Sequence, residues 1–162
     1  MSSEARLLRP LPRHLRSVPP PEVAAESADS PAHRQGAAWV LPGMPRTPGR
    51  ARGLVREWCQ SSHFGERVTE HVVLAANELV TRAVRGEARR VLVSVTLEDR
   101  DVLVEVSDPS AQRAPRRGGA GWLDPSAQED DCSWRLVDGL ATTWGVTRTG
   151  RTGRAWARVP AR

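Results

Sequence analysis

A change of hydrophobic period between residues 66 and 107 constrains the fold of this chain more than any other feature. Residues 65–84 carry apolar side chains at helical spacing, and Gly86 stands where a helix would end. Residues 89–108 then hold two β-branched runs joined by the polar segment 98–101, which is typical of two antiparallel strands. The sequence therefore predicts a long amphipathic helix followed directly by a β-hairpin.

Shorter segments on both sides extend this pattern. Residues 37–43 are apolar and end in Pro and Gly, so they predict a first strand, and residues 47–61 predict a helix. After the hairpin, residues 109–131 are rich in Pro, Gly and charge, and they form a loop unusually long for a compact domain. A further helix within 133–145 and a hairpin turning near Gly150 complete the chain.

The predicted order is strand, helix, helix, hairpin, long loop, helix, hairpin. This order indicates an α+β fold, a two-layer sandwich of helices on one mostly antiparallel sheet. Residues 1–36 have no apolar period that could bury a face. They predict a disordered tail ahead of one domain that spans 37–162.

Composition narrows the classes of function. All 24 basic residues are arginine and are interleaved with 19 acidic residues, so the net charge of +5 is weak support for a nucleic-acid partner. Two cysteines are too few for a disulfide framework or a zinc site. No stretch approaches the ~18 apolar residues that span a bilayer. We therefore expect a cytoplasmic protein that contacts no membrane.

Four sequence segments resemble those of a known family: ELVTRAVRG, VLVEVSD, RLVDGLATTWGV and GRAWARVP. Over residues 37–160, their order and spacing resemble the small ATP-binding regulators of the anti-sigma-factor serine kinase family. The resemblance implies the Bergerat fold, which is the histidine-kinase-like ATPase fold, with ATP and Mg²⁺ as cofactors. It also implies two kinds of partner, sigma factors and anti-sigma-factor antagonist domains, the latter phosphorylated on Ser or Thr.

The resemblance places the family's nucleotide site against the helix at 65–84. Family members carry there a Glu, proposed as general base, and four residues later an Asn that ligates Mg²⁺. Glu78 matches the first position, but the second is Arg82, whose guanidinium has no acceptor atom and cannot ligate a cation. Asn77 lies about 140° around the helix from Arg82 and points elsewhere. Spacing alone favours an exposed pair that contributes about 0.3–0.5 kcal/mol to helix stability.

The remaining parts of the family site fall on or beside the long loop. Asp108 occupies the place of the Asp that accepts the adenine amino group, although an Asp-Pro pair also simply ends strands. The two glycines at the entry to the next helix fall on Asp131 and Ser133. Loss of glycine blocks close approach of a phosphate and the Asp repels it, so the phosphate cradle is dismantled. An Asp or Ser at this place is typical of a helix N-cap.

Other residues suggest less specific roles. The long loop contains a glycine cluster, Gly118, Gly119 and Gly121, beside Arg116 and Arg117. This cluster could form a displaced phosphate-binding loop, and a flexible linker is the alternative. His71 has no metal-ligand companions. Four tryptophans fit core or core-edge positions and show no pattern for stacking on bases: Trp58, Trp134, Trp144 and Trp156.

The sequence thus predicts a regulator of the anti-sigma-factor kinase type with a weakened or lost nucleotide site. It would act by binding a sigma factor or an anti-sigma-factor antagonist. ATP remains a candidate cofactor, whereas Arg82 argues against Mg²⁺. Two alternatives stay open: an active ATP-dependent serine/threonine kinase with Glu78 as its base, and a nucleic-acid-binding protein. The oligomeric state is also open, a homodimer included.

Overall fold

The computed structural model describes residues 35–109, 132–149 and 152–162. These residues form eight elements: β1 (Gly36–Pro42), α1 (Thr47–Ser61), α2 (Glu66–Arg85), β2 (Arg90–Glu98), β3 (Asp101–Ser107), α3 (Cys132–Leu140), β4 (Thr143–Thr149) and β5 (Thr152–Pro160). The predicted order and α+β class are confirmed, and the first strand begins one residue inside the predicted tail. Residues 1–34, 110–131 and the predicted turn at Gly150 lie outside the described residues.

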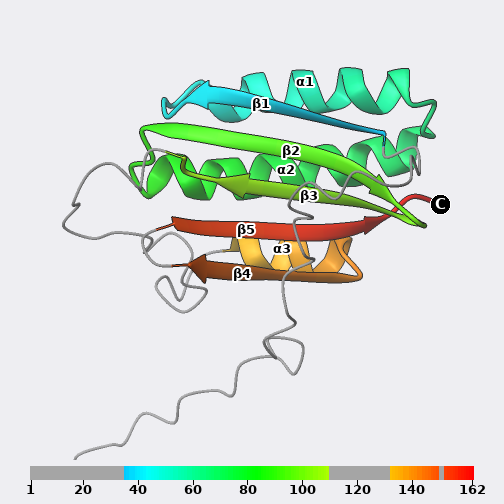
Figure 1. Ribbon diagram of the computed structural model, residues 1–162. Helices are drawn as coiled ribbons and strands as arrows, with labels where there is room; N and C mark the ends of the chain where they lie inside the picture. The colour runs from blue at the N-terminus through cyan, green and yellow to red at the C-terminus, as the bar shows by residue number, and fades with distance from the viewer. Residues whose placement is uncertain (1–34, 110–131, 150–151) are drawn as a thin grey trace, which may run out of the picture.

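The sheet is antiparallel throughout, with its strands in the order β1-β2-β3-β5-β4. Figure 1 shows α1, α2 and α3 on one face of this sheet, behind the strands in that view. The predicted two-layer sandwich is therefore confirmed. No helix in the described part of the chain is long and apolar enough to cross a membrane.

The core between the two layers is built from small and branched aliphatic side chains. Because side chains alternate along a strand, every second residue of β2 and β3 faces the helices. Six of these residues are fully buried valines: Val91, Val93, Val95, Val102, Val104 and Val106. The apolar stripe of α2 meets them with Val72, Ala76, Leu79, Val80 and Ala83. Burial of each larger aliphatic side chain stabilises the fold by about 1.5–3 kcal/mol.

Local signals set the ends of the elements. Pro48 lies in the first turn of α1, where its missing N–H costs nothing. Helix α2 ends at Arg85, and the N–H of Gly86 donates to the carbonyl oxygen of Arg82 at 2.9 Å. Asp99 turns β2 into β3 with a φ of 53°, a left-handed conformation that a short polar side chain tolerates.

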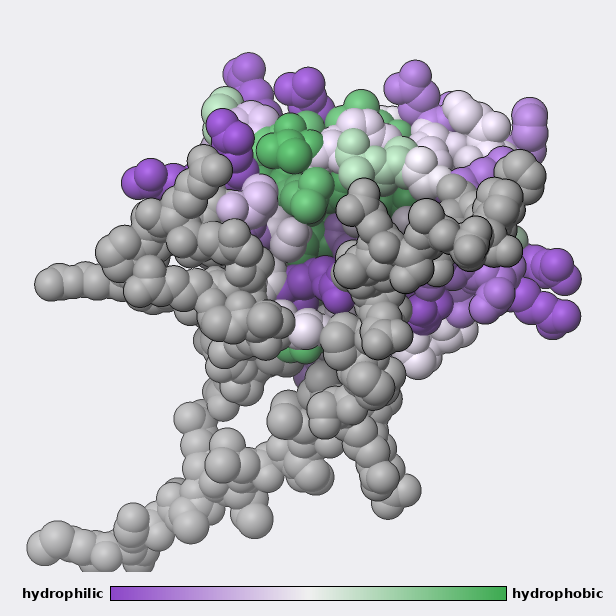
Figure 2. Space-filling view, viewed as in Figure 1, coloured by the Kyte–Doolittle hydropathy of each residue, from purple (hydrophilic) through white to green (hydrophobic). Residues whose placement is uncertain are grey.

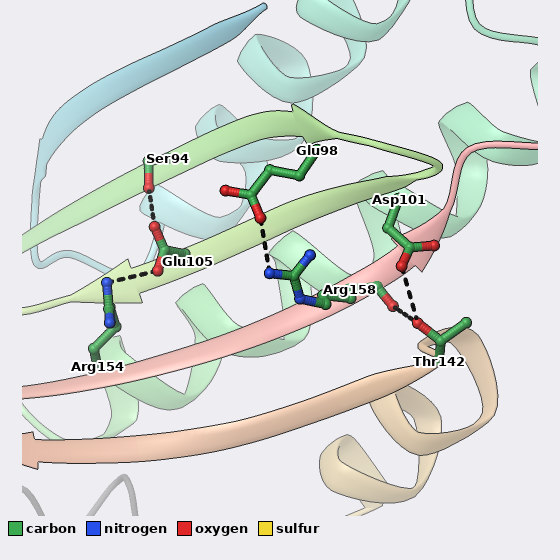
Figure 3. Close-up of polar contacts among 7 residues, drawn as sticks. All are labelled: Ser94, Glu98, Asp101, Glu105, Thr142, Arg154 and Arg158. Carbon is green, nitrogen blue, oxygen red and sulfur yellow. Dashed lines mark hydrogen bonds and ion pairs between the residues drawn. The ribbon is translucent and has the colours of Figure 1, made fainter. Parts of the chain in front are cut away.

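The face of the sheet away from the helices carries a ladder of charged pairs (Figure 3). Arg154 pairs with Glu105 at 2.7 Å, and Ser94 Oγ donates to the same carboxylate at 3.4 Å. Arg158 pairs with Glu98, also at 2.7 Å. These contacts tie β2 to β3 and β5, because each joins residues that the sheet register brings to one face.

Candidate functional site

Three elements that carry predicted site residues meet at one end of the sandwich. Helix α2 runs toward this end, β3 finishes there, and α3 begins there (Figure 1). The fold therefore brings the second half of α2, the residue after β3 and the first turn of α3 to the same place. The elements that carry Glu78, Arg82, Asp108 and Ser133 therefore meet at this end, and the role of these residues in a nucleotide site stays a prediction.

Arg82 is buried in this site and not exposed on the helix surface. Its exposed fraction is 4 %, and its guanidinium carbon lies 4.6 Å from the ring centroid of Trp134 on α3. This is the geometry of a cation–π contact, which contributes more when desolvated. The alternative of an exposed ion pair with Glu78 is therefore wrong for Arg82. The cause is tertiary: α3 packs over this part of α2, and helical spacing alone gives no sign of it.

Trp134 continues the stack to β4. Its ring lies 4.6 Å from that of Trp144, with an interplanar angle of 15°, so the two indoles stack. Trp144 Nε1 donates to Asp138 Oδ1 at 2.8 Å, which ties the stack back to α3. Both rings are almost fully buried, as the sequence predicts for core tryptophans. Their place in the candidate site was not predicted, and the spacing of four between Trp134 and Asp138 is the one local signal of a shared helix face.

Glu78 is half-buried, and its carboxylate is hydrogen-bonded to Asn77, which in turn contacts α1. Asn77 Nδ2 donates to Glu78 Oε1 at 3.0 Å, while Arg52 of α1 donates to Asn77 Oδ1 at 3.2 Å. The amide of Asn77 is thus committed to α1 and to its neighbour. This contact agrees with the prediction that Asn77 does not replace the missing metal ligand next to Arg82.

Asp108 is 5 % exposed and follows β3 directly. A buried carboxylate at this position is a suitable acceptor for an exocyclic amino group, and its role toward adenine stays a prediction. Ser133 is the second residue of α3, so it is not the N-cap of a helix that begins at Cys132. Asp131 and the glycine cluster at 118–121 lie outside the described residues.

The described side chains do not fit a magnesium ion at the family position. Magnesium binds through oxygen ligands, and Arg82 offers five donors and no acceptor. Within 35–109, 132–149 and 152–162, no group of three or more His, Cys, Asp or Glu side chains could hold a metal. His71 is half-buried on α2 and belongs to no such group.

Comparison with known proteins agrees with this geometry. The family model of the histidine kinase-like ATPase domain matches residues 41–157. The chain belongs to this family. The match begins in β1 and ends in β5, so it includes every element that builds the candidate site.

A solved structure shares this fold. The chain is similar to the RsbU and RsbW domains of Rv1364c from Mycobacterium tuberculosis, with a TM-score of 0.59 and 16 % identity. The similarity covers 77 % of this chain and 32 % of that one, so this ATPase-domain chain matches about a third of the longer protein. No curated protein matches the chain. At this identity the likeness shows the fold alone.

Proposed function

We propose that this protein is a cytoplasmic regulator of the anti-sigma-factor kinase type that acts mainly by binding a protein partner. Its nucleotide site is weakened because the metal position and the phosphate entry no longer suit Mg²⁺·ATP. One observation carries the proposal: Arg82 is buried and stacked on Trp134 at the place where the family has a metal-ligating Asn. Membership of the histidine kinase-like ATPase family and the likeness to a protein with an RsbW domain support the choice of regulator class.

The chemistry of Arg82 opposes a bound cation in two ways. It supplies no oxygen, and its own positive charge repels the ion. With an effective dielectric constant of 20, two like unit charges 4 Å apart repel by about 4 kcal/mol, and a divalent ion roughly doubles this. A guanidinium can instead contact a phosphate directly. Any ATP or ADP binding should therefore be weak and nearly independent of Mg²⁺.

Binding to a partner needs none of this chemistry. Sequestration of a sigma factor or of an anti-sigma-factor antagonist requires an intact surface and no turnover. The proposed partners follow from the resemblance of the chain to its family. The α1–α2 pair and the antiparallel sheet provide such a surface, and contacts within the chain hold them together.

An active ATP-dependent serine/threonine kinase is the second candidate. Two observations favour it: Glu78 keeps the position of the proposed base and is partly accessible, and Asp108 is a buried acceptor at the end of β3. This candidate requires Arg82 to move or to serve the phosphates itself. Nucleic-acid binding has no comparable observation in its favour.

Capture of partners separates the two candidates. The full chain and its Glu78→Ala variant are used as bait in a cytoplasmic extract, with and without ATP. We expect both baits to retain a sigma factor or an antagonist-type domain equally, because the base matters only for phosphoryl transfer. Phosphorylation of a retained partner by the wild-type chain, lost in Glu78→Ala, would establish the kinase instead. Retention of nucleic acid alone, falling steeply with salt, would favour the third class.

A further inference from the structure

Residues 35–109 carry a local cluster of positive charge. Residues 35–109 contain ten arginines and ten acidic residues, so this part has no net formal charge. Five exposed arginines nevertheless gather at one end, which we call the arginine end: Arg46, Arg50, Arg85, Arg89 and Arg90. There β1 finishes, α1 begins, α2 finishes and β2 begins (Figure 1). Glu87 is the acidic residue in these turns.

The backbone at the arginine end is firmly held. Gly43 N donates to the carbonyl oxygen of Arg89 at 2.9 Å, and Thr47 Oγ1 donates to the carbonyl oxygen of Pro42. A Cβ at Gly43 would lie 1.6 Å from the carbonyl oxygen of Ala88, so the two turns approach as closely as glycine allows. The arginines are therefore presented on a preorganised backbone, which lowers the cost of binding.

Two exposed apolar side chains lie near the end of β1, on the strand and in the turn after it. Val40 and Met44 have exposed fractions of 56 % and 50 %. Pro42 pairs with Arg90, and Val40 pairs with Leu92, so these four side chains share the face of the sheet away from the helices. Figure 2 shows this face, with hydrophobic residues over β1 and β2 and hydrophilic residues around them.

The mixture of side chains favours a protein over a nucleic acid. Met and Arg are enriched at protein interfaces, and apolar anchors beside charged groups are usual there. Stacking on bases needs accessible aromatic rings. In the described part of the chain, every tryptophan and the one phenylalanine are buried or half-buried. The positive charge of the arginine end calls for a negatively charged partner surface.

We propose that the arginine end binds an acidic segment of a protein partner, with an apolar side chain of that segment seated on Val40 and Met44. The inference rests on the proposed function, since it states the chemistry of the partner and where it docks. These arginines are not among the candidate site residues, although the arginine end and the candidate site lie at the same end of the sandwich, where α2 and β3 finish. Charge complementarity orients the segment, and the apolar contact gives it a fixed position.

Binding of a defined probe tests this docking. The probe is a short fluorescent peptide rich in Asp and Glu with two central leucines, measured by anisotropy against the full chain. Arg46→Glu with Arg89→Glu reverses two charges at the arginine end. Arg67→Glu with Arg100→Glu makes the same charge change at the start of α2 and in the β2–β3 turn, at the other end. We expect about tenfold weaker binding for the first pair and less than about twofold for the second.

Other outcomes overturn the docking proposal. Equal weakening in both pairs would mean that only the total charge matters, and tighter binding of a DNA duplex than of the peptide would assign this end to nucleic acid. The extract experiment keeps the two proposals separate. Equal capture of a sigma factor or antagonist by the wild type and by the arginine-end variant would refute the docking site and leave the function standing. Failure of every bait to capture one would refute the function, while the peptide result still decides the docking site.

Discussion

Replacing Arg82 with asparagine tests whether this side chain supports the fold and at the same time blocks the metal position. The change removes a desolvated cation–π contact with Trp134, which contributes about 2 kcal/mol. It also removes two buried methylene groups, each contributing about 0.8 kcal/mol. Relief of the desolvation of a buried charge offsets part of this loss. We expect the variant to be less stable by roughly 2–4 kcal/mol, which a domain with about 5–15 kcal/mol survives.

Urea unfolding followed by tryptophan fluorescence measures this loss, because Trp134 and Trp144 report on the stack directly. Arg85→Asn is the matched control: Arg85 lies three residues further along α2 and is exposed, so its loss should change stability by at most about 0.5 kcal/mol. The same two proteins are then titrated with ATP in the presence of Mg²⁺. Arg82→Asn should bind more tightly than the wild type, because an amide oxygen replaces a positive charge.

Two results would refute this reasoning. Equal stability of Arg82→Asn and Arg85→Asn would mean that the stack contributes nothing to the fold. Weaker Mg²⁺·ATP binding by a folded Arg82→Asn protein would mean that the guanidinium serves the nucleotide and does not obstruct it. The first result would refute the role of Arg82 in stability, and the second would refute its role in weakening Mg²⁺·ATP binding.

Three further predictions follow from other parts of the molecule. Arg82→Asn combined with Asp131→Gly and Ser133→Gly should raise ATP affinity in calorimetry above that of the single variant, because Asp131 no longer repels phosphate; an unchanged affinity would show that the pocket is closed. Gly43→Ala should destabilise the fold by about 1–3 kcal/mol in urea unfolding, since the added Cβ would meet the carbonyl oxygen of Ala88. The control is Gly53→Ala, in the interior of α1, where the added Cβ meets open space. This variant should stabilise the fold by about 0.5–1 kcal/mol. Burial raises the pKa of Cys59 to about 11 in the folded protein. The thiol of the unfolded chain therefore ionises at lower pH, and the stability of the fold should fall as the pH rises from about 9 toward 11. In thermal unfolding, Cys59→Ala should lose this part of the pH dependence.

The elements that local signals define were predicted closely. Helix α1 has the predicted bounds, and α2 begins and ends one residue later than predicted. Their apolar period is regular, and Pro48 and Gly86 mark a start and a stop. The β2–β3 hairpin followed from alternating valines around a polar turn. In each case, neighbours within a few residues carry the information.

The packing around Arg82 could not be predicted from the sequence. Glu78 and Arg82 are four residues apart, which indicates a shared helix face and says nothing of what covers it. The residue that covers Arg82 is Trp134, on a helix that begins 50 residues later in the chain. Such a contact depends on how α3 packs on α2 and on the placing of Trp144 from β4. No periodicity within a short window can report that arrangement.

Calorimetric titration of the wild-type chain with ATP, once with Mg²⁺ and once with a chelator, tests the loss of the metal position most directly. With Arg82 buried against Trp134, we predict binding that is weak and the same in both titrations. Micromolar affinity in Mg²⁺ that disappears on chelation would contradict the account and would establish a working Mg²⁺·ATP site.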